Sequence, residues 1–153
     1  MNYNSMQKNR NSTASRLAIN LILLEFLLLV IQFIIGMWIN LFAVFPSFGS
    51  SFFMYGMMRV MFSVPELMVH MMTGMLIGLI SIMIFVILAI GGDYRLSSLS
   101  AIASVSILTA GIGGLEFIFS GFSNNVFSFI MSMGFIFTVV AYSLILYLLS
   151  SRT

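Results

Sequence analysis

Four long apolar runs, each nearly free of charge, constrain the fold of this chain more than any other feature. They cover residues 16–44, 65–90, 96–119 and 126–150. Each run is longer than the roughly 20 residues that a helix needs to cross a hydrocarbon core of about 30 Å. Lipid offers no hydrogen-bond partner to exposed backbone groups, so helices are the expected form. The sequence therefore predicts an all-α fold: a polytopic membrane protein built as a bundle of four transmembrane helices.

Composition supports a lipid environment. Of the 153 residues, 61% are hydrophobic and only 7% are charged, whereas soluble domains carry about 25% charged residues. Such a chain cannot cover itself with a polar surface, so the lipid bilayer is its expected partner and a water-soluble enzyme is excluded. No basic patch with interleaved aromatics lies outside the apolar runs, which excludes nucleic acid as a partner. The absence of cysteine excludes disulfides, thiolate metal sites and iron–sulfur clusters.

Two regions differ in composition. Residues 1–15 are polar, rich in Asn and Ser, and lack apolar periodicity, so we expect a flexible cytoplasmic tail. Residues 16–153 form a single four-helix transmembrane domain.

The distribution of basic residues predicts the orientation. Arg59 falls on one side of the expected membrane. All other basic residues fall on the opposite side: Lys8, Arg10, Arg16, Arg95 and Arg152. Because Lys and Arg are enriched in cytoplasmic loops, we expect a multi-pass protein of the cell membrane with both termini in the cytoplasm.

The connection between the first two runs, residues 45–64, is unlike an ordinary loop. It opens with a cluster of helix breakers around Pro46 and then becomes apolar again over about eleven residues. That length is too short to span a bilayer but suits a helix lying in the interface or folded back over the bundle. We therefore expect a short interfacial segment that caps the outer face.

The methionines form a repeated pattern. The same spacing occurs twice: Met54-x-x-Met57-Met58-x-x-Met61 and Met68-x-x-Met71-Met72-x-x-Met75. Thioethers select Cu(I), and this spacing places two sulfur atoms on one helical face. One hypothesis is therefore a Cu(I)-handling membrane protein with Met57, Met58, Met71 and Met72 as ligands. Methionine also fills irregular packing between helices, so the same pattern is open to a purely structural interpretation.

The first run carries polar residues in its apolar sequence. Glu25 lies about 13 Å along the helix from Arg16, near the middle of the bilayer. Gln32 and Gly36 follow on almost the same face. Ionisable groups at this depth are costly and face the bundle interior. Glu25 either takes part in a proton path or is a protonated carboxyl that bonds to Gln32 or to a serine on another helix.

The second run carries the single histidine. Glu66 and His70 are four residues apart, hence adjacent on one helical face, and Gly74 extends that face with a small residue. The groove beneath the imidazole suits a flat macrocycle or the close approach of another helix. Glu116, near the outer end of the third run, reaches the same leaflet.

Haem is one candidate cofactor for this region. His70 together with a methionine from the outer part of the fourth run, Met131 or Met133, is a chemically sound pair of axial ligands.

The run Pro65-Glu66-Leu-Met-Val-His70-Met-Met-Thr-Gly74 resembles the Glu-x-x-His-Arg segment of the haem A synthase family, whose archaeal members can be one four-helix half. The resemblance implies a haem-binding bundle with an outward-facing haem pocket. It also implies that Glu66 acts as an acid and His70 as the axial ligand.

The leading functional hypothesis is a non-catalytic role. Catalytic groups are scarce, aqueous domains are nearly absent, and small residues occupy several helix faces, as close helix contacts require. We therefore expect an accessory or structural subunit of a membrane-embedded respiratory or redox complex. Its expected partners are other membrane subunits or further copies of the same chain. Haem binding and copper handling remain the alternatives.

Overall fold

The computed structural model describes the backbone of residues 3–45, 58, 60 and 62–151, and the side chains from residue 13 onward within those ranges. It contains four long helices: α1 (Tyr3–Phe42), α3 (Pro65–Ile90), α4 (Tyr94–Phe119) and α5 (Asn125–Ser150). All four contain a stretch long and apolar enough to cross a membrane. The predicted all-α fold with four membrane-spanning helices is confirmed.

Local sequence signals set the helix ends. Pro65 occupies the first turn of α3, where its missing N–H costs nothing. The Asp93 carboxylate caps α4, accepting from the backbone N–H of Arg95 at 2.9 Å and of Leu96 at 3.3 Å. The Asn124 side chain accepts from the N–H of Val126 in the same way at 3.1 Å. Helices α4 and α5 therefore begin one or two residues before the predicted apolar runs, directly after their capping residues.

Helix α1 begins earlier than the composition suggests. It is continuous from Tyr3, whereas the apolar run begins only at residue 16 and we expected residues 1–15 to form a flexible tail. Residues 3–15 are helical because polarity alone does not prevent a helix, and the expected flexibility of this stretch stays a prediction. This stretch contains neither glycine nor proline, so nothing in it interrupts a helix that the apolar run has already nucleated.

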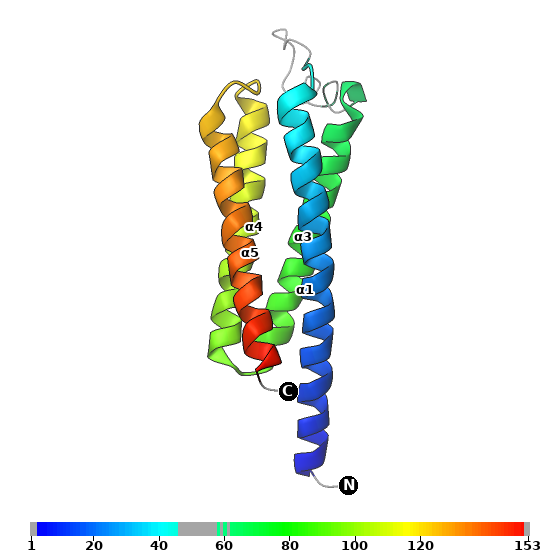
Figure 1. Ribbon diagram of the computed structural model, residues 1–153, viewed down its shortest axis with the longest axis vertical. Helices are drawn as coiled ribbons and strands as arrows, with labels where there is room; N and C mark the ends of the chain where they lie inside the picture. Colours follow the sequence, from blue (N-terminus) through cyan, green and yellow to red (C-terminus); the bar gives the residue numbers. More distant parts are fainter. Residues whose placement is uncertain (1–2, 46–57, 59, 61, 152–153) are drawn as a thin grey trace.

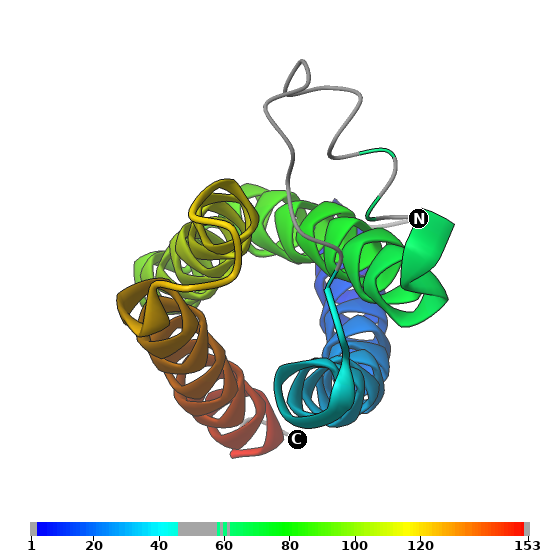
Figure 2. The ribbon, with the colours of Figure 1, turned by 90° about the horizontal axis from the view of Figure 1, so that it is seen from above.

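The four helices form a ring (Figures 1 and 2). In order around the ring, α1 packs on α3, α3 on α4 and α4 on α5; α5 then meets α1 in the least extensive of the four contacts. The start of α1, the α3–α4 turn and the end of α5 lie at one end, here called the termini end (Figure 1). The opposite end, with the α4–α5 connection, is called the loop end.

On α1 and α5 the residues that face the neighbouring helices, here called the seam of each helix, recur every three or four residues. On α1 the seam consists of Ala18, Ile22, Glu25, Leu29, Gln32, Gly36 and Ile39. On α5 it contains Gly134, Thr138, Ala141, Ile145 and Leu149. This spacing is that of helices packed side by side in left-handed bundles. It accounts for the long, nearly parallel contacts of the ring.

Two clusters of buried apolar side chains fill the interior. The larger lies toward the termini end and includes Ile22, Ile84, Leu96 and Ile145. The smaller lies at the loop end and joins Ile39 of α1, Leu67 of α3 and Ile118 of α4. The buried polar side chains Glu25, Ser81 and Ser100 lie among the residues of the larger cluster, whereas Gln32 and His70 lie between the two clusters.

The expected interfacial segment is described only in part. Met58, Val60, Phe62 and Ser63 are in helical conformation. Val60 is buried and belongs, with Val64, to the cluster at the loop end. The described part of this segment therefore packs against the loop end of the bundle through Val60 and Val64, and its role as a cap stays a prediction. Residues 46–57, including Met57, lie outside the described part of the chain.

Candidate functional site

The contact between α1 and α3 is built around His70 and Gln32. The amide nitrogen Nε2 of Gln32 donates to the backbone oxygen of His70 at 3.0 Å and lies 3.1 Å from the imidazole Nε2. Two glycines on the same seams make room for these side chains. A Cβ at Gly36 would lie 2.9 Å from Cε1 of His70, and one at Gly74 would lie 3.1 Å from Nε2 of Gln32. Each helix therefore offers a glycine opposite the polar side chain of the other.

These contacts fix the tautomer of His70. Only the NH₂ group of Gln32 can donate to a backbone carbonyl, so the atom facing the imidazole is also a donor. The Nε2 atom of His70 must then accept, and a neutral imidazole carries its proton on Nδ1. Both Nδ1 of His70 and Oε1 of Gln32 are buried without a hydrogen-bond partner.

The predicted groove beneath the imidazole is filled by α1. The Gln32 amide packs on Gly74, and the imidazole edge packs on Gly36. The axial nitrogen that a haem iron would need is already the acceptor for Gln32. The arrangement of His70 in this structure does not fit a haem. It fits the second interpretation of the same sequence pattern, close approach of a neighbouring helix.

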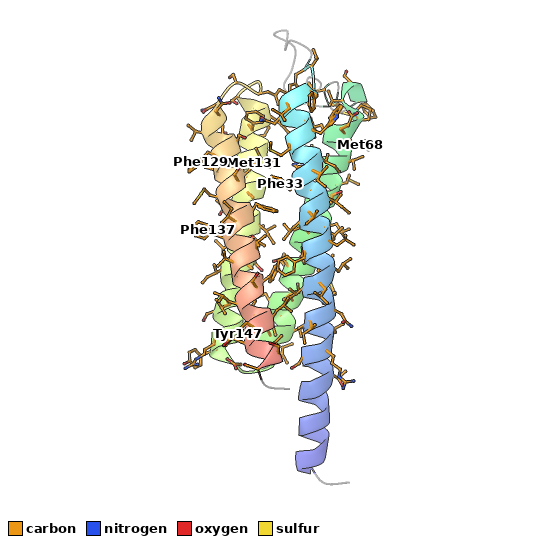
Figure 3. The ribbon with its side chains drawn as sticks, in the orientation of Figure 1. Phe33, Met68, Phe129, Met131, Phe137 and Tyr147 are labelled. Atoms are coloured by element: carbon orange, nitrogen blue, oxygen red, sulfur yellow. The ribbon has the colours of Figure 1, made fainter. Side chains whose placement is uncertain are left out.

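The two methionines considered as second axial ligands lie between α4 and α5. The sulfur of Met131 would be 3.3 Å from a Cβ at Gly114. Met133 lines a shallow groove that it shares with Phe129 and Phe137. Figure 3 shows both phenylalanines pointing away from the bundle. Neither of these contacts brings a methionine to His70, whose contacts described above are all with α1.

The acidic residues near the loop end are not brought together with His70 by any described interaction. Glu66 is half-buried at the start of α3, and Glu116 is exposed on α4. Within the ranges that the structure describes, no group of three or more His, Asp or Glu side chains is placed to hold a metal ion.

The described methionines among the proposed copper ligands differ in their exposure. Met71 is half-buried and packs on the cluster at the loop end, whereas Met72 is 60% exposed. Met58 is also exposed, and Met57 lies outside the described residues. The three described methionines thus provide packing and lipid-facing surface, the structural interpretation of the repeated pattern.

Glu25 lies fully inside the bundle, on the seam that the sequence predicts. Its exposed fraction is 0%, and neither carboxyl oxygen has a hydrogen-bond partner. The bond to Gln32 that we considered is not formed, because the donors of Gln32 are directed at His70. Glu25 is thus a buried ionisable group whose hydrogen-bonding capacity is unused.

A hydroxyl network that the sequence analysis missed crosses the bundle. The hydroxyl of Tyr142 on α5 donates to Oγ of Ser81 on α3 at 2.9 Å. Ser81 in turn bonds Oγ of Ser104 on α4 at 2.8 Å. The only signal in the sequence was position, because Ser81 and Tyr142 fall among the buried faces of their helices. Residue type gives no signal at these positions, since serine and tyrosine are common in apolar helices.

The fold and its interior define the class of this protein: a multi-pass integral membrane protein whose polar groups lie between its helices. Comparisons with protein-family models, with curated proteins and with solved structures found no match to this chain. The functional proposal therefore rests on the geometry of the chain itself.

Proposed function

We propose that this protein is an accessory or structural subunit of a membrane-embedded complex, of the respiratory or redox type. The observation that carries the proposal is the contact between α1 and α5, here called the α1–α5 seam. These helices have the least extensive contact of the ring. They also diverge toward the loop end, where the other neighbouring pairs stay together (Figures 1 and 2).

A pair of aromatic rings marks where the seam opens. Phe33 of α1 stacks on Phe135 of α5 with ring centroids 5.2 Å apart. One turn further toward the loop end, Met37 lies on the same face of α1 and is 42% exposed. A helix of a partner subunit placed here would complete the ring on its least packed side. Such a contact uses shape and apolar packing, as helix association in lipid requires.

The use of the interior polar groups also supports a structural role. His70 and Gln32 join α1 to α3, and the network of Ser81, Ser104 and Tyr142 joins α3, α4 and α5. Hydrogen bonds of this kind between membrane helices are typically worth about 0.6 kcal/mol and up to about 1.7 kcal/mol each. These side chains stabilise a rigid scaffold rather than present reactive groups to a substrate.

The test is purification of the full chain in mild detergent from its native membrane, with a photoreactive residue at Met37 or, as a control, at Leu108. Leu108 is 53% exposed on α4, away from the seam. We expect a stoichiometric partner that cross-links from position 37 and not from position 108. A protein that purifies alone and cross-links only to lipid at both positions contradicts the proposal.

The absorption spectrum of the same preparation tests the haem alternative. A Soret band that is lost in His70→Ala would favour the haem-binding bundle implied by the resemblance to haem A synthases. A colourless preparation that retains its partner subunits favours the structural role.

A further inference from the structure

The register between α1 and α3 relates Glu25 to the hydroxyl network. Helices α1 and α3 run in opposite directions, and two contacts define their register: Gly36 faces His70, and Gln32 faces Gly74. Moving seven residues back along α1 from Gln32 leads to Glu25. Moving seven residues on along α3 from Gly74 leads to Ser81. Because both helices rise equally per residue, Glu25 lies at the level of Ser81.

Packing around Glu25 connects it to α5 as well. The next residue on α1, Phe26, has its ring edge against Tyr142, with centroids 6.4 Å apart. Ile22, one turn away on the same face as Glu25, belongs to the same buried cluster as Tyr142. Glu25 therefore sits in the layer of the bundle where Tyr142 reaches across to Ser81.

No described cation faces Glu25. From α5 the titratable group in this layer is Tyr142, and from α3 and α4 the polar groups are Ser81 and Ser104. On its own helix, Arg16 lies about 13 Å away along the axis. An ionised carboxylate buried without a cation or a donor costs far more than a neutral acid. The neutral, proton-bearing form is the one that this layer accommodates.

The directions of the hydrogen bonds favour a proton donor at Glu25. Ser104 is 3.3 Å from the backbone oxygen of Ser81, to which it donates. With that proton used there, Ser81 is the donor to Oγ of Ser104 at 2.8 Å. Tyr142 then donates to Ser81. Because the Tyr142 hydroxyl uses its proton toward Ser81, the oxygen of Tyr142 retains acceptor lone pairs. The hydroxyl network can therefore accept one further donor at the oxygen of Tyr142.

We propose that Glu25 is a proton-binding site whose exchangeable proton supplies this donor. The protonated acid engages the Tyr142 oxygen, by rotation of its side chain or through a bridging water, and the relay continues through Ser81 to Ser104. The binding step is simple: one proton adds to the carboxylate of Glu25, and the same proton leaves on release. The ligand class is thus the proton. The site is independent of the partner that covers the α1–α5 seam.

The experiment is infrared spectroscopy of the full chain in lipid nanodiscs at neutral pH. We expect the carbonyl stretch of a protonated carboxylic acid, its isotopic shift on ¹³C-glutamate labelling, and its loss in Glu25→Gln. The matched control Glu66→Gln should retain the band. Labelling of the unmodified chain assigns the band to glutamate even if Glu25→Gln does not fold. Absence of the labelled band from the unmodified chain would overturn the proposal.

Two further measurements test exchange and the relay. Transfer to D₂O buffer should lower the frequency of the band, because the acid proton exchanges; a band unchanged after prolonged incubation contradicts an exchangeable site. In Tyr142→Phe the acceptor is gone, so the carbonyl frequency should rise. An unchanged frequency in this variant would show that Glu25 does not engage Tyr142 and would overturn the relay. High Na⁺ should leave the band intact, whereas its loss would identify a metal cation as the ligand.

Discussion

At the residue scale, the contact between α1 and α3 depends on two glycines. Gly36 accepts the imidazole of His70, and Gly74 accepts the amide of Gln32. This reciprocal arrangement places both polar side chains against the backbone of the facing helix. The absence of a Cβ is therefore as important to the contact as the hydrogen bond that it permits.

Substitution of Gly36 by Ala should destabilise the bundle. The new Cβ would lie 2.9 Å from Cε1 of His70, so the ring must move and the bond to Gln32 weakens, at a cost of about 1–3 kcal/mol. The control is Gly111→Ala on α4, where no atom lies within 4 Å of the new Cβ. Thermal stability in detergent, followed by size-exclusion chromatography after heating, should fall only for Gly36→Ala. Equal stability of the two variants would contradict the interlocked contact.

Glu25→Met should stabilise the isolated protein. Methionine has a similar length and removes the two buried oxygens of Glu25. Even when the acid proton bonds Tyr142, the carbonyl oxygen has no donor, and relief of such a group is worth about 1–3 kcal/mol. The midpoint of thermal unfolding should rise, while the infrared band assigned to Glu25 disappears. A lower midpoint would mean that the bond from Glu25 to Tyr142 stabilises the folded protein by more than the buried acid costs.

At the element scale, α4 and α5 pack more closely than any other pair. Gly134 lies against α4, where a Cβ would be 2.6 Å from the backbone oxygen of Ser106 and 2.8 Å from Cβ of Ala110. A backbone oxygen cannot move aside as a flexible side chain can. At this level the close approach of the two helices therefore depends on the missing side chain of Gly134.

Gly134→Ala should force α4 and α5 apart. We expect a loss of about 1–3 kcal/mol from overpacking, measured by unfolding in increasing mole fraction of sodium dodecyl sulfate. Gly78→Ala is the matched control, because its nearest neighbour, Cγ2 of Ile107, would be at an ordinary 4.0 Å. The same loss in both variants would argue for a general effect of replacing glycine rather than for close packing.

The sequence determined the elements well because their signals are local. The apolar run from Pro65 to Ile90 coincides with α3, and Asp93 and Asn124 set the starts of α4 and α5. The start of α1 was missed, because a polar composition does not itself end a helix.

The interior contacts were less predictable, because they depend on register between helices. The sequence placed Glu25 and Gln32 on one face, but Gln32 bonds His70 instead. Gln32 bonds His70 because His70 is the residue of α3 that lies opposite it. The spacing of residues within α1 contains no information about that register. The hydrogen bond between Tyr142 and Ser81 was not predictable either, because it depends on the register between α5 and α3.

At the scale of the whole molecule, the orientation in the membrane remains a prediction from charge. The chain has no cysteine, so single cysteines give an unambiguous test. A membrane-impermeant maleimide applied to intact cells should label Ser123→Cys, at the exposed loop end. It should label Tyr94→Cys, at the exposed termini end, only after permeabilisation. The reverse pattern would place both termini outside.

Helix α1 is longer than the ring of helices to which it belongs. Its 40 residues extend about 60 Å at 1.5 Å per residue, roughly twice the thickness of a hydrocarbon core of about 30 Å. The first turns therefore project past the termini end as a rod (Figure 1). No break separates these turns from the buried face of α1. A partner that rotates or tilts them would therefore rotate or tilt the buried part of the helix too. A displacement of this kind would move Glu25 and Gln32 as well, because both lie on the same uninterrupted helix.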